Sequence, residues 1–236
     1  MTPGRMKKGT GLSRRLAAMA DLLPETESLA DIGTDHGGLL IYLISTGRIR
    51  QGIGVEIAQG PFERASANVS ALGLGDRIEI RRGDGLKPLA PSEVTACAVA
   101  GLGGKTIRGI LDGSPEVAGG LSWLLLQPMT GAGTVRIYLQ ENGWRICGES
   151  LVEEKGILYE IILAHRGKME RLSRLEAEFG PILLAEKPPL LELAIRRKIM
   201  GLQHIAARLE KSASAESAGK KIRLTGQIKE WEALLK

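Results

Sequence analysis

The sequence is poor in residues that mark several common classes of protein. Only 3% of its 236 residues are aromatic, so we do not expect a ligand to be recognised by an array of stacked rings. It has two cysteines, Cys97 and Cys147, each inside an apolar run. Two isolated thiols support neither a disulfide framework nor a zinc site, and both are predicted to be small buried side chains in a reducing compartment.

Long apolar segments and clustered metal ligands are also lacking. No uninterrupted apolar stretch approaches the roughly 20 residues that a helix needs to cross a bilayer. The basic start of the chain is not followed by the apolar region of a signal peptide. The three histidines are scattered and have no ligand partners nearby. We therefore expect a soluble, cytoplasmic, monomeric protein that binds no membrane and no metal.

Positive charge is unevenly distributed, although the net charge is only +5. Residues 1–15 carry five basic residues and no acidic one, and residues 186–236 carry 11 basic and 6 acidic ones. The segment between them has 16 basic and 21 acidic residues. Basic ends around an acidic body favour a polyanionic partner held by the terminal elements. The alternative is a solvated tail and a solvated helix face.

Short apolar runs alternate with helical patterns over the first two thirds of the chain. Strands are predicted at 28–32, 52–57, 78–82, 95–100 and 123–128, with helices at 12–23, 61–72, 105–112 and 133–142 and a further one after the first strand. The helix at 12–23 is amphipathic and is expected to turn Arg14 and Arg15 toward solvent. Two last strands, 144–152 and 157–164, form an antiparallel hairpin. This order predicts an α/β fold with a mostly parallel sheet and an antiparallel end hairpin, in a domain spanning 1–167. Such an arrangement resembles the Rossmann-like fold of class I methyltransferases.

The remaining segment, 168–236, is predicted to be a separate helical hairpin. Apolar residues from Ile195 to Leu209 and from Leu224 to Leu235 follow alternating spacings of four and three, which is typical of a coiled-coil seam. The small-residue stretch SASAESAG is the expected turn between the two helices, and Pro188 and Pro189 precede the first of them. The alternative is that both helices dock on the sheet.

Four consecutive strand ends are rich in glycine and acids: DIGTDHGG, VEIAQG, RGDGL and AGLGG. In an open α/β sheet these ends line the ligand crevice. Glycines after the first strand let the backbone approach a ligand closely and lead into a helix. The N-terminus of that helix would favour the negatively charged carboxylate of S-adenosylmethionine. Glu56 is placed to accept ribose hydroxyls, and Asp84 to accept from the adenine amine. NAD remains open as an alternative, although the loop lacks the glycine pattern that cradles phosphates.

The phrases LSRRL, ADIGTDHG, VEIAQGPFERASANV, GDGL, AGLGG and LLLQP, taken together, strongly resemble the bacterial tRNA adenine-N1 methyltransferases of the TrmK type. The resemblance runs from about Leu12 to Gly167, and the helical hairpin matches the family's coiled-coil extension. It implies transfer of a methyl group from S-adenosylmethionine to N1 of adenine 22 in the D-loop region of tRNA. The chain departs from the family at Leu102, where methionine is usual, and at Met129, where asparagine is usual.

The resemblance also implies specific contacts. The cofactor contacts are Asp31, Gly33, Asp35, His36, Glu56, Asp84, Gly85, Gly101 and Leu102. The tRNA contacts come from the N-terminal helix and the C-terminal hairpin, and our candidates for phosphate binding are Arg14, Arg15, Arg196, Arg197 and Lys198.

Two residues are the candidates for catalysis. N1 of adenine carries an in-plane lone pair, so the enzyme must mainly align the reactants and exclude water. Asp35, an acid in a glycine loop, is the candidate for stabilising the charge that develops on the base; the alternative is that it caps the following helix. His36 would orient the base or the cofactor; the alternative is a purely structural role.

Three rival functions remain open from the sequence. The first is a methyltransferase that acts on another RNA or on a small molecule. The second is a non-catalytic adapter that binds S-adenosylmethionine or RNA and holds a partner with its helical hairpin. The third is an NAD oxidoreductase.

Overall fold

The computed structural model describes residues 11–209 and 215–235, which fall into two units. One unit ends at Leu172 and the other begins at Ser173. Among the described residues, none of the helices has the length and apolar character required to cross a bilayer.

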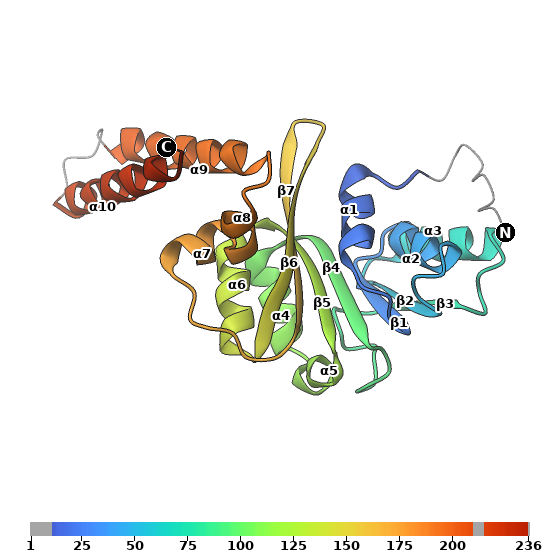
Figure 1. Cartoon of the computed structure of the whole chain (residues 1–236). Coiled ribbons are helices and arrows are strands. Elements are labelled where there is room, and N and C mark those ends of the chain that lie inside the picture. Colours follow the sequence, from blue (N-terminus) through green and yellow to red (C-terminus); the bar gives the residue numbers. More distant parts are fainter. Residues whose placement is uncertain (1–10, 210–214, 236) are drawn as a thin grey trace. The chain divides into compact units, whose positions relative to one another are not determined.

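A seven-stranded mixed sheet organises the first unit (Figure 1). Its order is β3-β2-β1-β4-β5-β7-β6, and the first five strands of that order run parallel. β7 pairs antiparallel with both β5 and β6, which confirms the predicted end hairpin. The order reverses between β1 and β4, so a ligand crevice is expected at the carboxyl ends there. The strands are β1 (Ser28–Ile32), β2 (Gln51–Glu56), β3 (Ile78–Arg82), β4 (Ala96–Gly103), β5 (Trp123–Thr130), β6 (Trp144–Glu154) and β7 (Ile157–Arg166).

The central strands are buried over most of their length because helices cover both faces of the sheet. Every residue of β1 is buried, as are the first four residues of β4. Such strands read as continuous apolar runs rather than as alternating patterns. β4 is longer than predicted: it continues through Gly103, with irregular pairing to β5 after Ala100. The AGLGG segment is therefore largely strand and not loop.

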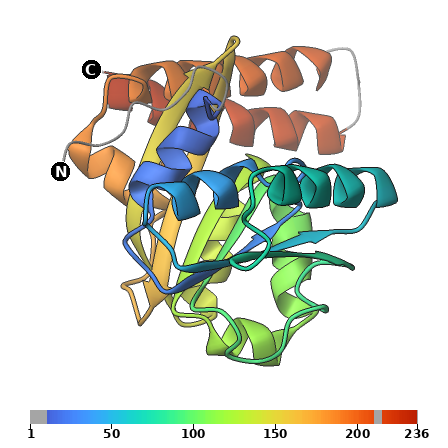
Figure 2. The same ribbon diagram turned by 90° about the vertical axis from the view of Figure 1, so that its right-hand side faces the viewer.

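Helices α1, α2 and α3 lie on one face, and α4 and α6 lie on the other (Figures 1 and 2). α5 packs against α4 and was not predicted. Gly143, with φ of 73°, follows α6 in the left-handed conformation expected after a helix C-cap. The helices of this unit are α1 (Arg14–Leu22), α2 (Gly38–Ser45), α3 (Gln59–Ala71), α4 (Gly104–Asp112), α5 (Pro115–Gly120) and α6 (Ala132–Glu141).

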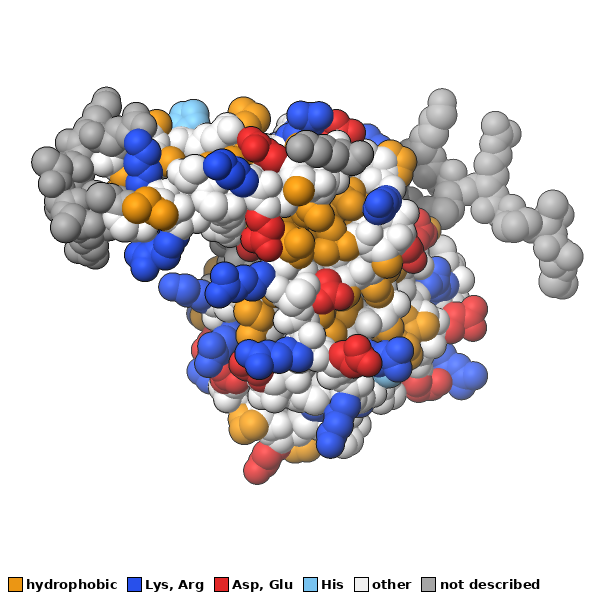
Figure 3. Space-filling model, turned by 60° about the vertical axis from the view of Figure 1, so that its left-hand side comes forward, with side chains coloured by type: hydrophobic (Ala, Val, Ile, Leu, Met, Phe, Trp, Pro, Cys, Tyr) orange, Lys and Arg blue, Asp and Glu red, His pale blue; other side chains and the backbone are white. Residues whose placement is uncertain are grey.

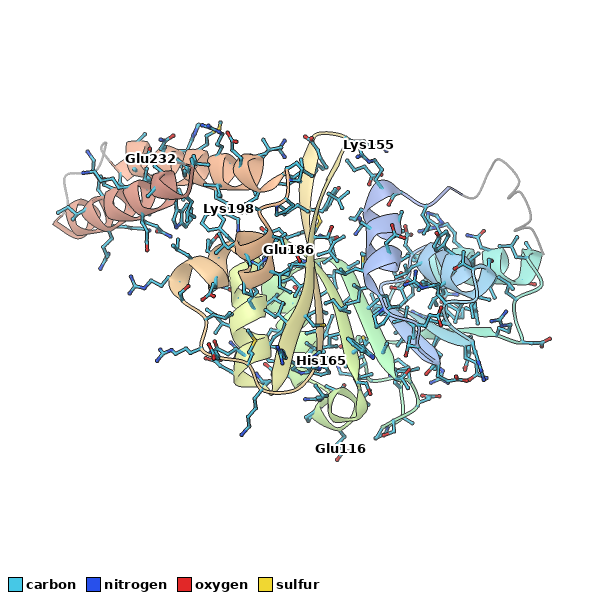
Figure 4. The ribbon with its side chains drawn as sticks, in the orientation of Figure 1. Glu116, Lys155, His165, Glu186, Lys198 and Glu232 are labelled. Atoms are coloured by element: carbon cyan, nitrogen blue, oxygen red, sulfur yellow. The ribbon has the colours of Figure 1, made fainter. Side chains whose placement is uncertain are left out.

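The β6–β7 hairpin extends beyond its partner β5 (Figure 1). Its last pair with β5 is Leu126↔Ile162, whereas β6 and β7 continue to pair as far as Glu154↔Ile157. The strands meet at a two-residue turn, Lys155 and Gly156, whose φ angles are both positive, as a type I′ turn requires (Figure 4). α1 packs along this hairpin, and the backbone N–H of Arg14 donates to Glu154 Oε1 at 2.9 Å.

A buried charge cluster joins α6 to the same hairpin. The guanidinium of Arg136 donates to Glu149 at 2.7 Å and to Glu160 at 2.8 Å. The side chains of Arg136 and Glu149 are completely buried. Each charge in such a buried cluster is stabilised by its partners, because removal of one leaves an unpaired ion in the interior. The cluster therefore fixes the hairpin against the second helical layer.

The second unit consists of helices α7 (Arg174–Phe179), α8 (Pro181–Glu186), α9 (Leu191–Leu209) and α10 (Ala215–Glu232), with a terminal turn, η1 (Ala233–Leu235). α9 and α10 pack side by side, which confirms the predicted helix pair (Figure 1). The rings of Phe179 and Trp231 meet edge to face at 4.9 Å. The expected SASAESAG turn is partly wrong: from Ala215 onward it is helical, and residues 210–214 lie outside the described part of the chain.

Candidate active site

The loop after β1 is folded tightly by three left-handed residues. Gly33, Asp35 and Gly37 have φ angles of 74°, 53° and 73°. The N–H of Gly33 donates to the carbonyl of Val55 in β2 at 2.9 Å, so the loop stays close to the neighbouring strand. Gly37 is the N-cap of α2, and no side chain caps that helix. The alternative that Asp35 serves as the helix cap is therefore wrong, and the first N–H groups of α2 face the loop without a side-chain acceptor.

Asp31 is a buried carboxyl at the end of β1, with 5% of its surface exposed. The hydroxyl of Thr34 donates to its Oδ2 at 2.7 Å. Burial raises the pKa of Asp31 to about 6, and this outweighs the lowering effect of the Thr34 hydrogen bond. Asp31 is therefore a group whose charge responds to pH near neutrality.

Glu56 ends β2 and holds the loop after β1. It is buried, and its Oε1 accepts from the backbone N–H of Asp35 at 2.5 Å. The next residue, Ile57, has 65% of its surface exposed, although an isoleucine next to a buried strand usually packs inside. The pair presents a carboxylate beside an open apolar surface, a combination that suits a ribose and a flat base. Ile57 was not among the residues predicted for the site, although its position directly after the acid was a signal.

Asp35 and His36 form an exposed polar pair within this loop. Asp35 Oδ2 lies 3.4 Å from His36 Nε2, and Asp35 Oδ1 lies 3.6 Å from the guanidinium of Arg64 on α3. The carbonyl of His36 accepts from Asn68 Nδ2 at 3.0 Å. The two catalytic candidates are thus side by side, anchored to α3 and open to solvent.

Asp84 and Gly85 lie at the adjoining strand end. Arg82 of β3 pairs with Glu56, and the N–H of Gly83 donates to the carbonyl of Glu56 at 2.9 Å. Asp84 follows directly, exposed and paired with Lys87 Nζ at 2.5 Å. The first three strand ends therefore converge on one edge of the sheet, as predicted.

The end of β4 is held by a buried amide. Gln127 of β5 is fully buried, and its Oε1 accepts from the N–H of Gly101 at 3.1 Å. The same oxygen accepts from Arg15 Nη1 at 2.6 Å. The expectation that Arg15 turns to solvent is wrong: it is half-buried over the carboxyl edge of the sheet. Gln127 was not among the residues predicted for the site, although an amide inside the apolar run WLLLQP was a signal.

The remaining basic candidates differ in their exposure and in the protein groups that they contact. Arg14 is exposed on α1. On α9, Arg196 is 58% exposed and pairs with Glu192 at 2.8 Å, and Arg197 is half-buried. Lys198, labelled in Figure 4, donates to the carbonyl of Glu178 at 2.6 Å and lies 3.0 Å from its carboxylate. On the face shown in Figure 3, Lys and Arg side chains are scattered and do not gather in one patch.

The cysteines and possible metal ligands add nothing to this site. Cys97 is buried as expected, but the prediction for Cys147 is wrong because it is exposed. Cys147 sits at a bulge between Ile146 and Gly148, which interrupts the alternation of β6. Within residues 11–209 and 215–235, no three His, Cys, Asp or Glu side chains gather where they could hold a metal ion.

Known proteins resemble this chain over almost its whole length. The family model described as TrmK, tRNA (adenine(22)-N(1))-methyltransferase, matches residues 29–232. The tRNA (adenine(22)-N(1))-methyltransferase of Bacillus subtilis is 31% identical over 217 residues, which are 90% of this chain and 91% of that protein.

Solved structures of relatives share the fold, and two of them hold a ligand. Streptococcus pneumoniae Sp1610 in complex with S-adenosyl-L-methionine has a TM-score of 0.82 and 31% identity, covering 96% of this chain and 100% of that one. TrmK of M. capricolum in complex with S-adenosyl-homocysteine has a TM-score of 0.81 and 26% identity, covering 94% and 96%.

Proposed function

The chain belongs to the tRNA (adenine(22)-N(1))-methyltransferase family, and we propose that the carboxyl edge of its sheet is where methyl transfer takes place. The enzyme takes the methyl group from S-adenosyl-L-methionine, which the relative from S. pneumoniae binds, and adds it to N1 of adenine 22 in tRNA. The observation that carries this location is the convergence of the β1 loop, Glu56 and Asp84 at one edge.

The residues at this edge fit the parts of S-adenosyl-L-methionine. The carboxylate of Glu56 would accept the ribose hydroxyls, and exposed Ile57 would cover one face of the adenine. The carboxylate of Asp84 would accept a hydrogen bond from the exocyclic amine of the adenine, once its ion pair with Lys87 is broken. The N-terminus of α2 lacks a side-chain cap and would face the methionine carboxylate, whose negative charge it favours. Asp31, Gly33, Gly85, Gly101 and Leu102 complete the proposed cofactor contacts.

The transfer itself requires alignment more than proton movement. The cofactor would supply an electrophilic methyl group. As the lone pair of adenine N1 bonds to the methyl carbon, the bond from that carbon to sulfur would break and S-adenosyl-homocysteine would leave. The base becomes cationic as the new bond forms, and we assign to Asp35 the stabilisation of that charge. His36, 3.4 Å from Asp35, would hold this carboxylate in place and contact the base. The chain's contribution is thus to position N1 in line with the methyl carbon and to exclude water.

The tRNA would be held by basic residues on both units. Exposed Arg14 on α1 and exposed Arg196 on α9 are the strongest candidates for phosphate contacts, and Arg197 follows Arg196 in α9. Lys198 and Arg15 are poorer candidates because each is half-buried where it binds Glu178 or Gln127, whereas the Arg196–Glu192 pair is exposed. We propose further that the enzyme acts as a monomer in the cytoplasm, where its tRNA substrate is found.

Mass spectrometry of nucleosides tests the proposed function. Two tRNA transcripts that differ only at position 22, one with adenine and one with guanine, are incubated with the enzyme and S-adenosyl-L-methionine. We expect 1-methyladenosine from the first transcript alone. Equal methylation of both would point to another target in the RNA, and cofactor binding without methylation of either would favour a non-catalytic adapter.

A further inference from the structure

Gln127 has an unusual position for an amide side chain. It is completely buried near the carboxyl end of β5, in a run of otherwise apolar residues. Its Oε1 accepts two hydrogen bonds, from Arg15 Nη1 at 2.6 Å and from the Gly101 N–H at 3.1 Å. Its Nε2 lies 3.6 Å from the sulfur of Met129, a weak acceptor. One side chain therefore links α1, β4 and β5.

Arg15 is one of two donors that hold the orientation of this amide. An amide can exchange its oxygen and nitrogen by rotating about its last bond, and its partners select the orientation. A guanidinium has only donors, so it holds the oxygen toward itself. Without Arg15, the Gly101 N–H alone would select that orientation.

The bond to Gly101 matters because this glycine shapes the end of β4. Its φ angle is 76°, a conformation that other residues rarely adopt. Pairing between β4 and β5 becomes irregular at this point. The segment 101–103 borders the β1 loop across the switch in strand order, so its shape would form part of the floor of the proposed site.

Arg15 is itself held in place by its surroundings. Its guanidinium lies 5.5 Å from the centre of the Tyr159 ring on β7. The helix that carries it is capped by Ser13 and tied to the hairpin through the Arg14 N–H and Glu154. A side chain engaged on two sides in this way is suited to position other groups and poorly suited to reach for a phosphate.

We propose that Arg15 is a positioning residue for methyl transfer: it orients the Gln127 amide, which holds the Gly101 N–H and so fixes the floor on which the target base is aligned. This inference rests on the proposed function, since it assigns a role within the same site. It does not require Arg15 to touch the cofactor or the tRNA.

A double-mutant cycle of three variants tests the coupling between Arg15 and Gln127. Gln127→Glu keeps an oxygen for both donors, so it should lower kcat less than Arg15→Met does. Arg15→Met should lower kcat at least tenfold while the Kd for S-adenosyl-L-methionine changes less than threefold. The double variant leaves a buried carboxylate without its cation, so its loss should exceed the product of the two single losses. Arg15→Lys, which restores one donor, should recover part of the activity.

Arg50→Met is the matched control, because Arg50 is 79% exposed and lies just before β2, at the amino edge of the sheet. It should behave as wild type. The proposal is overturned if Arg15→Met weakens cofactor binding more than tenfold with kcat kept at saturation, which would make Arg15 a cofactor ligand. A rise in the KM for tRNA alone, or multiplicative losses in the double variant, would overturn it as well.

A second measurement does not depend on methylation. In nitrogen-15 spectra of the free protein, the amide signal of Gly101 should shift in Arg15→Met, while that of Gly47, in the turn after α2, should not. An unmoved Gly101 signal would overturn the inference. If wild-type enzyme leaves adenine 22 unmodified, the proposed function fails, and this spectrum still decides whether Arg15 holds the Gly101 segment.

Discussion

Gly104, at the start of α4, packs directly against the backbone of Gly131, which precedes α6. A Cβ atom at position 104 would lie 2.5 Å from the carbonyl oxygen of Gly131 and 3.0 Å from that of Thr130. Both neighbours are backbone atoms that cannot rotate away. The close approach of these two glycines brings the segments after β4 and β5 together at the proposed site of transfer.

Gly104→Ala should therefore lower both stability and activity. Overpacking of this kind costs roughly 1–3 kcal/mol in free energy of unfolding, and a displaced segment misaligns the base, so kcat should fall about tenfold or more. Gly109→Ala in the same helix is the control, because a Cβ there meets nothing within 4 Å. The Gly109→Ala variant should have a free energy of unfolding about 0.5–1 kcal/mol higher than that of wild type. Equal effects of the two variants in urea unfolding would contradict this explanation.

Glu56→Gln should weaken cofactor binding with little effect on folding. The glutamine oxygen can still accept from the Asp35 N–H, but the charged acceptor for the ribose hydroxyls is lost. Hydrogen bonds to a charged group contribute about 1.5–3 kcal/mol, so the Kd for S-adenosyl-L-methionine should rise at least tenfold in calorimetry. Glu27→Gln, at a residue 60% exposed and paired with Arg50, is the control. An unchanged Kd for Glu56→Gln would remove Glu56 from the cofactor site.

Asp35→Asn should lower kcat with little change in stability or cofactor affinity. Asparagine tolerates the left-handed backbone at φ of 53°, and the backbone N–H that binds Glu56 is retained. Loss of the charge that would face the cationic base should lower kcat about 10²-fold. Single-turnover measurements at saturating tRNA and cofactor would show it. If the variant keeps the wild-type kcat, Asp35 is a structural residue of the loop.

Asp31→Asn should change how stability depends on pH. Burial raises the pKa of Asp31 from 3.8 to about 6, so the folded state holds this proton more tightly than the unfolded chain does. The contribution of Asp31 to the stability of the fold is most favourable below about pH 4 and is lost as pH rises through about 6. The variant has no such loss, so the difference in free energy of unfolding between variant and wild type should move in the variant's favour by up to about 3 kcal/mol as pH rises from 4 to 7. Denaturant unfolding at both pH values measures this difference, and a constant difference would contradict the shift.

Replacement of Arg196 and Arg197 by glutamine should weaken tRNA binding without altering the site. Each lost phosphate contact should reduce the slope of log affinity against log salt concentration by about 1, while kcat at saturating tRNA stays unchanged. Arg108→Gln, an exposed position on α4, is the control. Filter binding at several salt concentrations gives the slope, and identical slopes would show that these arginines only solvate α9.

Several elements of the fold could be predicted because they depend on neighbours in the sequence. β1 and β3 have the predicted bounds, and the other parallel strands differ from prediction by a few residues at most. Hydrophobic periodicity and glycine turns are local properties, and they suffice to order strands and helices. α7 and α8 were missed because six residues are too few to show a helical period. In the site, the glycine loop and Glu56 stood out for the same local reason.

The sequence alone thus determined the alternation of strands and helices, and with it the edge of the sheet at which a ligand binds. Only the tertiary structure decided where individual side chains point. Arg15 follows a solvent-exposed pattern on α1, yet a buried amide more than 100 positions away draws it over the sheet edge. Cys147 follows a buried pattern, yet a bulge turns it outward. Such outcomes depend on contacts between distant segments, which no local pattern contains.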